Sequence, residues 1–176
     1  MPRPVPCTRH SVMAVSLPSA PEGEDRMTSF TTVQTAAMQR ALRAAASPDA
    51  PPGPNPRVGC VILSPDGDVL AEGHHRGAGS AHAEVDALAN LAATGASARG
   101  ATVLVTLEPC TMCAGAIVLA RVARLVLGAW EPRTGACGSV RDVVRDSRAN
   151  HQVEVRAGLR AQESQDLLTA FFADRR

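Results

Sequence analysis

Two short stretches of the sequence carry side chains that bind transition metals and move protons. The first is His82-x-Glu84, and the second is Pro109-Cys110-x-x-Cys113. A catalytic zinc site takes three protein ligands and leaves a fourth position open for water. The two cysteines lie one turn apart at the start of a predicted helix, where the helix dipole favours thiolates. We therefore predict that His82, Cys110 and Cys113 hold one Zn2+ per chain.

Glu84 follows the predicted histidine ligand by two residues, so its carboxylate lies near the metal without having to bind it. A carboxylate in that place takes a proton from water and hands it to a substrate. Each half of the pattern alone has a plainer explanation, because His-x-Glu occurs on exposed helices and Cys-x-x-Cys forms redox pairs or half of a structural zinc site. The sequence shows neither a thioredoxin-like context nor a second ligand pair with matching spacing. We therefore predict that Glu84 is the catalytic residue of a zinc enzyme.

The elements that must position these residues are read from hydrophobic periodicity and turn signals. Helical spacing predicts helices over residues 30–46, 82–93, 110–121 and 161–173. Apolar and β-branched runs predict strands over residues 58–63, 69–73, 101–107, 122–127 and 153–155. This order, a helix and a hairpin followed by alternating helices and strands, predicts an α/β/α sandwich with a central mixed sheet and helices on both faces. His82 and Cys110 then fall at strand-to-helix junctions, where ligands collect in such sheets.

Composition restricts the classes of protein to which this chain can belong. The 176 residues and 45% hydrophobic content suit one domain, which we place at residues 29–176, after a Ser- and Pro-rich extension, residues 1–28, that we expect to be disordered. The net charge of +1 excludes a general basic coat for nucleic acid, so any RNA contact needs a local patch. Five scattered cysteines and the lack of an apolar run of transmembrane length lead us to expect a cytoplasmic protein.

The order His-x-Glu and then Pro-Cys-x-x-Cys is the signature of zinc deaminases. Beyond it, the C-terminal half resembles the bacterial tRNA adenosine deaminases of the cytidine and deoxycytidylate deaminase superfamily. The stretches that carry this resemblance are residues 105–117, 128–139, 150–154 and 171–176. The resemblance implies the cytidine deaminase-like fold and the hydrolysis of adenosine to inosine at the tRNA wobble position, with the base turned out of the anticodon loop into a pocket. It also implies a homodimer, with residues 114–120 as a candidate interface.

The N-terminal half departs from that family. Residues 54–60, 72–76 and 99–102 instead resemble the deaminase domain of riboflavin biosynthesis. Where the tRNA enzymes carry a base-binding asparagine, this chain reads His74-His75-Arg76. The riboflavin enzymes, in turn, space their two cysteines further apart and usually carry a reductase domain. Deamination of a free nucleobase, a nucleoside or a riboflavin-pathway pyrimidine is therefore the alternative function, and Glu84 argues against a third class, a non-catalytic zinc protein.

Candidate substrate contacts come from both halves of the chain. From the N-terminal half we take Asn55 and His75, whose plainer interpretations are a turn residue between prolines and an exposed histidine at a strand end. From the stretches that match the tRNA enzymes we take four residues, for which the alternative is an exposed loop. They are Glu131, Arg133, Asn150 and His151. Trp130, the single tryptophan, either stacks on a base or packs on the sheet.

Overall fold

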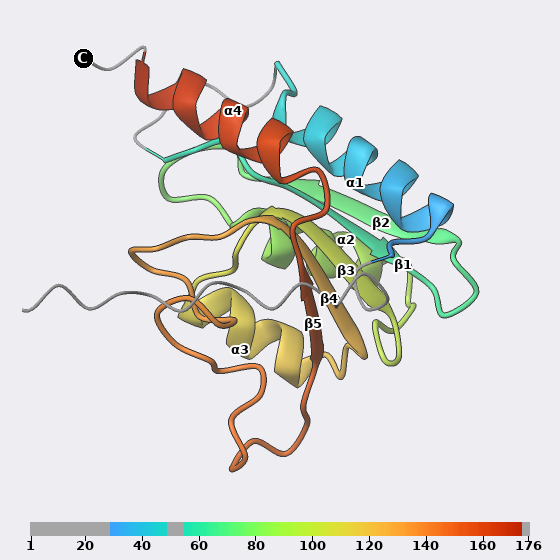
Figure 1. The fold of residues 1–176 in the computed structure, drawn as a ribbon. Helices are drawn as coiled ribbons and strands as arrows, with labels where there is room; N and C mark the ends of the chain where they lie inside the picture. The colour runs from blue at the N-terminus through green and yellow to red at the C-terminus, as the bar shows by residue number, and fades with distance from the viewer. Residues whose placement is uncertain (1–28, 49–54, 174–176) are drawn as a thin grey trace, which may run out of the picture.

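A five-stranded mixed sheet forms the centre of the computed structural model, which describes residues 29–48 and 55–173 (Figure 1). The predicted extension, residues 1–28, lies outside the described residues. The strands are β1 (Gly59–Leu63), β2 (Val69–His74), β3 (Thr102–Leu107), β4 (Arg124–Ala129) and β5 (Glu154–Ala157), and their order in the sheet is β2-β1-β3-β4-β5. β1 pairs antiparallel with β2 and β3, whereas β3, β4 and β5 run parallel. The hairpin and the alternating pattern that follows it therefore form one mixed sheet, as predicted.

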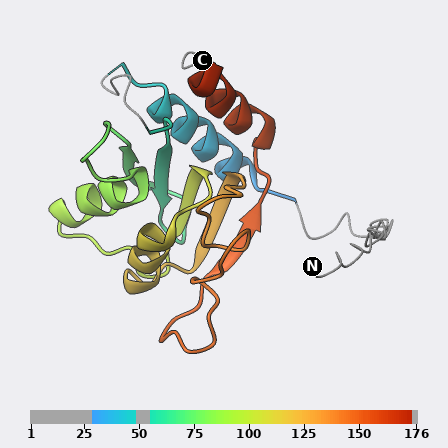
Figure 2. The same cartoon turned by 90° about the vertical axis from the view of Figure 1, so that its left-hand side faces the viewer.

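Helices cover both faces of this sheet, which confirms the predicted α/β/α sandwich (Figures 1 and 2). The helices are α1 (Thr32–Ala45), α2 (Ala83–Ala93), α3 (Thr111–Leu119) and α4 (Ala161–Ala173). α1 and α4 lie on one face, and α2 and α3 lie on the other. Along β4, Leu125 and Leu127 belong to the core under α2 and α3, while Val126 belongs to the core under α1. Because β3 and β4 are covered on both faces, their side chains are apolar almost throughout.

A glycine in β2 determines how closely α2 can approach the sheet. A Cβ at Gly73 would clash with the backbone of Ala83 and Ala87 in α2. Only glycine permits such close contact between a strand and a helix backbone. Since α2 begins directly after His82, this contact also places the N-terminus of α2, and with it the predicted histidine ligand.

The third predicted helix ends earlier than its apolar pattern indicates. The sequence predicted a helix to residue 121, but α3 ends at Leu119 and Arg121 takes a left-handed conformation with φ of 61°. The N–H of Val122 then donates to Ile117 O and that of Arg121 to Val118 O, which together form a Schellman cap. Such caps usually carry glycine at the left-handed position, so an arginine there gave no stop signal and the next strand starts later than predicted.

A long connection, residues 130–153, links the parallel strands β4 and β5 and lies alongside α3 (Figure 1). Parallel neighbours require a crossover, and connections of this length without regular structure usually serve a function. In the described part of the chain, none of the helices has the length and apolar character that a membrane crossing requires.

Candidate active site of a zinc enzyme

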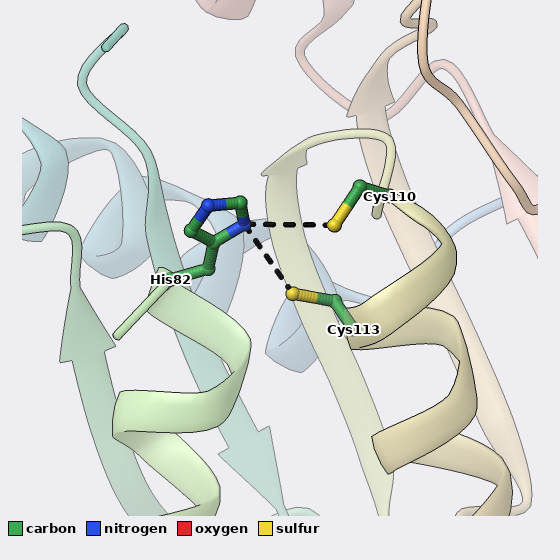
Figure 3. Close-up of side chains that lie close together, drawn as sticks. All are labelled: His82, Cys110 and Cys113. Atoms are coloured by element: carbon green, nitrogen blue, oxygen red, sulfur yellow. Dashed lines mark hydrogen bonds between the residues drawn. The ribbon is translucent and has the colours of Figure 1, made fainter. Parts of the chain in front are cut away.

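Three candidate metal ligands meet where two helices begin. His82 is the N-cap of α2, Cys110 is the N-cap of α3, and Cys113 lies in the first turn of α3. The Nδ1 atom of His82 is 3.6 Å from Cys110 Sγ and 3.5 Å from Cys113 Sγ (Figure 3). Among the described residues, these three form the one group of histidine, cysteine and acidic side chains that is close enough to share a metal ion.

The spacing of these atoms fits a zinc ion. Zinc bonds of about 2.0–2.1 Å to nitrogen and about 2.3 Å to sulfur, meeting at a tetrahedral angle, place the two ligand atoms about 3.5 Å apart. The His82–Cys110 and His82–Cys113 separations match this value. Three ligands of this kind leave a fourth position for water, which is the arrangement of a catalytic rather than a structural site.

Burial makes the neutral forms of two candidate ligands, Cys113 and His82, more stable than their charged forms. Burial raises the pKa of the Cys113 thiol well above its ordinary value, and the nearby charge of Glu84 raises it further. Burial also lowers the pKa of His82, with a smaller contribution from His75. A divalent cation reverses the first effect, because coordination deprotonates a thiol outright, and the neutral imidazole is the form that binds metal.

Glu84 lies in the first turn of α2, and its carboxyl group is buried beside the ligand group. Burial raises the pKa of Glu84 to about 7, while hydrogen bonds from its own backbone N–H and from the Cys113 thiol act in the opposite direction. A carboxylate in this place is within reach of both the metal position and the adjoining cavity, as a proton carrier must be.

A cavity of about 230 Å³ opens beside the ligand group. Its wall includes Asn55, His75, Glu84, Glu131 and Thr134 together with two of the three candidate ligands. Pockets for drug-sized ligands usually measure roughly 300–1,000 Å³. The smaller volume here suits a single ring system, such as one nucleobase, rather than a whole nucleotide.

Comparison with known proteins identifies the kind of site. A family model described as the cytidine and deoxycytidylate deaminase zinc-binding region matches residues 31–129, which are more than half of the chain and include the three ligands and Glu84. The chain belongs to this family of zinc-binding deaminases. The zinc cofactor expected from the sequence agrees with both the family and the ligand geometry.

The curated relatives of this deaminase include tRNA enzymes. The chain is 38% identical over 125 residues to the tRNA-specific adenosine deaminase of Bacillus subtilis, a match that covers 68% of this chain and 77% of that protein. It is 42% identical over 125 residues to the tRNA-specific adenosine deaminase of Haemophilus influenzae, covering 68% of this chain and 72% of that protein. Both matches therefore extend over most of the relative.

The solved structures that resemble this chain include a tRNA deaminase and a riboflavin-pathway deaminase, the two kinds that the two halves of the sequence resemble. A tRNA:A34 deaminase described in work on A-to-I editing at the wobble position aligns with a TM-score of 0.65 and 36% identity, over 76% of this chain and 99% of that one. A diaminohydroxyphosphoribosylaminopyrimidine deaminase and reductase from Thermotoga maritima aligns with a TM-score of 0.67 and 32% identity, over 80% of this chain. This chain spans only 40% of that larger protein.

Asn55 and His75 lie together in the cavity wall of this deaminase. His75 Nδ1 is 2.9 Å from the carbonyl oxygen of Ala81, and His75 Nε2 is 3.0 Å from Asn55 Nδ2. A carbonyl oxygen only accepts, so we assign the proton to Nδ1, and Nε2 then accepts from the Asn55 amide. This bond orients the Asn55 amide. His75 is only 6% exposed and its ring packs edge-on against His82, so the alternative of an exposed histidine at the strand end is wrong.

The four candidates from the C-terminal half are separated by the structure. Glu131 lines the cavity, and the exposed Arg133 follows it closely, with its backbone N–H donating to Glu131 Oε1. Asn150 and His151 lie outside the cavity wall. The carbonyl of Asn150 accepts from Arg121, and His151 Nε2 donates to Val122 O at 2.6 Å. These two bonds hold the end of the 130–153 connection against the end of α3.

Two polar residues of the cavity wall, Glu108 and Thr134, were not among the site residues predicted from the sequence. Glu108 directly follows β3 and precedes the candidate ligand Cys110 by two residues, and a charged residue directly after a buried strand is a signal that could have been noticed. Trp130 is 45% exposed, so the alternative that it is buried against the sheet is wrong.

Proposed function

We propose that this zinc deaminase converts adenosine to inosine at the wobble position of tRNA. The observation that carries the proposal is the identity of 38–42% to tRNA-specific adenosine deaminases over 72–77% of their length. The cavity supports it, because a space for one ring system requires the target base to leave its stack and enter alone. The adenine ring carbon that bears the amine gains the oxygen of water, and the amine leaves as ammonia.

Different residues of the cavity and its surroundings would bind zinc, transfer protons and hold the substrate. Zinc held by His82, Cys110 and Cys113 would supply a Lewis acid that lowers the pKa of water towards neutrality. Glu84 takes one proton from the attacking water and passes it to the ring nitrogen, then takes the second proton from the oxygen now bound to the ring carbon and passes it to the departing amine. Asn55, oriented by His75, holds the edge of the base. The exposed Arg133 meets phosphates outside the cavity.

The test is the deamination of a short RNA. An anticodon stem-loop with adenosine at the wobble position is incubated with the zinc-loaded protein, and inosine is measured by mass spectrometry of the digested RNA. Inosine from the native protein, and none from the Glu84→Ala variant with its zinc retained, is the expected result. A native protein that binds zinc but leaves the adenosine intact would refute the tRNA substrate.

A second candidate substrate is supported by the Asn55–His75 pair. The pair lies in the cavity within the half of the chain that resembles the riboflavin deaminases, and the Thermotoga maritima enzyme aligns over 80% of this chain. A free pyrimidine of the kind named for that enzyme would use the same zinc and Glu84. Ammonia release from such pyrimidines and from free nucleosides, measured beside the RNA reaction, separates the two candidates.

We also propose that a second copy of the chain covers the outer face of α3. Met112, Gly115 and Leu119 share this face at helical spacing, and Leu119 is 81% exposed. Side chains this large and apolar, grouped on one helix face, usually mark a contact between proteins. The face falls within residues 114–120 and their neighbours, where the family resemblance places the homodimer contact. Because tRNA is the proposed substrate, we place the reaction in the cytoplasm.

A further inference from the structure

Glu108 is a buried acid that the proposed chemistry leaves without a role. It follows β3 directly, is 3% exposed, and lines the cavity. Its Oε2 accepts from the N–H of Glu131 at 3.0 Å, and its Oε1 accepts from the N–H groups of Cys137 at 2.9 Å and Ser139 at 3.0 Å. Within the described ranges, none of the ion pairs involves Glu108. Backbone donors, rather than a cation, satisfy this buried carboxylate.

The three donors belong to one segment, residues 131–139, which we call the lip loop. The lip loop closes around the Glu108 carboxylate so tightly that a Cβ at Gly135 would clash with it. Further contacts join the loop to the metal-binding segment, since the N–H of Ala136 donates to Pro109 O at 2.9 Å and Gly135 forms a β-bridge with Cys110. The lip loop and the start of α3 are therefore built as one unit with Glu108 inside it.

Of the lip-loop residues in the cavity wall, Glu131 is the one that bonds directly to Glu108. Glu131 and Thr134 are the lip-loop residues in the cavity wall. The backbone of Glu131 is held at both ends, because its N–H donates to Glu108 Oε2 and its carbonyl accepts from Ser139 Oγ at 2.8 Å. The Glu131 carboxylate is also turned back on the loop, where Oε1 accepts from the N–H of Arg133. Removing the Glu108 bond would leave the Glu131 N–H without its acceptor and loosen the hold on this residue of the cavity wall.

We infer that Glu108 is a positioning residue, which holds Glu131 in place and thereby sets how tightly the cavity binds its substrate, without taking part in proton transfer. The measurement of KM rests on the proposed deamination, whereas the measurement of hydrogen exchange at Glu131 does not. Glu108 affects substrate binding through Glu131, so its removal should weaken binding, whereas zinc and the turnover step depend on other side chains.

The variant that isolates this role is Glu108→Gln. Oε1 accepts two of the three bonds, so the amide oxygen of glutamine stays with Cys137 and Ser139 and its NH2 group faces the N–H of Glu131. The NH2 group of the glutamine and the backbone N–H of Glu131 are both donors, so only the bond to Glu131 is lost. Hydrogen exchange at the Glu131 amide should become about tenfold faster and KM should rise about tenfold, while kcat stays within about twofold and zinc stays at one per chain.

Two further variants make the test specific. In a Glu131→Ala background, Glu108→Gln should change KM by less than about twofold, because the Glu131 side chain that the backbone bond to Glu108 positions is already gone. The matched control is Glu154→Gln, which makes the same carboxylate-to-amide change in an exposed acid on β5 that pairs with Arg124 and Arg156. This control should leave KM and the exchange of Glu131 unchanged.

Each contrary result has a definite meaning. Unchanged exchange at Glu131 in Glu108→Gln would overturn the inference whatever the substrate is. Faster exchange with an unchanged KM, a loss of zinc, or a full KM effect that persists in the Glu131→Ala background would overturn the positioning role as well. A native protein with no RNA turnover, combined with the expected exchange result, would instead overturn the proposed tRNA substrate and leave the hold on Glu131 standing.

Discussion

The roles proposed for Glu84 and for the candidate metal ligands are separate, although these side chains lie side by side. Glu84 lies in the cavity wall and is not one of the three ligand residues. The Glu84→Ala variant should therefore keep one zinc per chain and lose turnover by roughly 10²–10⁴-fold, the usual contribution of a general acid–base group. Zinc content by atomic absorption and single-turnover kinetics measure the two properties. A fully active variant would contradict the assignment of the proton carrier.

Asn55 and His75 should behave as one unit at the residue scale, because the bond between His75 Nε2 and the Asn55 amide orients the amide in the cavity. His75→Phe removes the acceptor, and Asn55→Ala removes the amide. We expect each variant to lower kcat/KM by about tenfold, as the loss of one oriented hydrogen bond does. The double variant should be little worse than either single one. Independent, multiplied effects in this double-mutant cycle would show that Asn55 does not depend on His75.

At the scale of the elements, the close packing of α2 on β2 places the ligand His82. The close approach depends on Gly73, where a Cβ meets the backbone of Ala83 and Ala87. Gly73→Ala should therefore reduce the free energy of unfolding by about 1–3 kcal/mol, the usual cost of an overpacked contact. Zinc affinity should also fall, because α2 and His82 must move away from the cysteines.

Chemical denaturation and a zinc competition titration measure these two effects. The prediction fails if Gly73→Ala is as stable as the native protein and binds zinc equally well. Such a result would mean that β2 and α2 can move apart without displacing His82.

The ends of the helices show where a local sequence pattern is insufficient to predict an element's bounds. The start of α1 follows from a capping box of Thr31 and Gln34 that is visible in the sequence. The end of α3 does not, because Arg121 takes a left-handed conformation without the usual glycine and donates to the distant Asn150 carbonyl. The end of α3 is thus accompanied by a contact with Asn150, which lies in a later part of the chain. The residues next to Arg121 in the sequence do not indicate this contact.

At the scale of the whole molecule, zinc should stabilise the fold by joining α2 to α3. Its ligands come from the N-termini of both helices. Removal of zinc with a chelator should lower the melting temperature by roughly 5–10 °C, relative to the protein with zinc about 100-fold above its Kd. Differential scanning calorimetry measures the change, and added zinc should reverse it. The Glu84→Ala variant should show the same difference, and an unchanged melting temperature in the native protein would contradict a zinc site that bridges the helices.

The proposed homodimer gives a second prediction for the whole molecule. Leu119→Glu places a charge at the C-terminal end of the apolar face of α3, at its most exposed side chain, and should produce monomers at micromolar concentration. Sedimentation velocity distinguishes the two states. Val33→Glu, at another exposed apolar position on α1, is the matched control and should leave the dimer intact. A native protein that sediments as a monomer would refute the proposed contact.

The candidate zinc ligands and Glu84 could be proposed from the sequence because their chemistry depends on short spacings along the chain. The i and i+3 cysteines and the i and i+2 histidine and glutamate each lie on one short segment, and hydrophobic periodicity likewise reports contiguous helices and strands. The α/β/α sandwich follows from the order of those elements.

The remaining features of the site depend on which distant segments meet. His75 is buried because Asn55 and Ala81 enclose it, and Glu108 matters because the lip loop returns to it from beyond β4. His151 lies outside the cavity because it bonds to the end of α3. The contacts of Glu108 and His151 depend on the crossover between the parallel strands β4 and β5, whereas the contact of His75 with Asn55 depends on the pairing of β1 with β2. Hydrophobic periodicity in the sequence indicates single helices and strands but not which distant segments meet. Only the tertiary structure therefore decides these contacts.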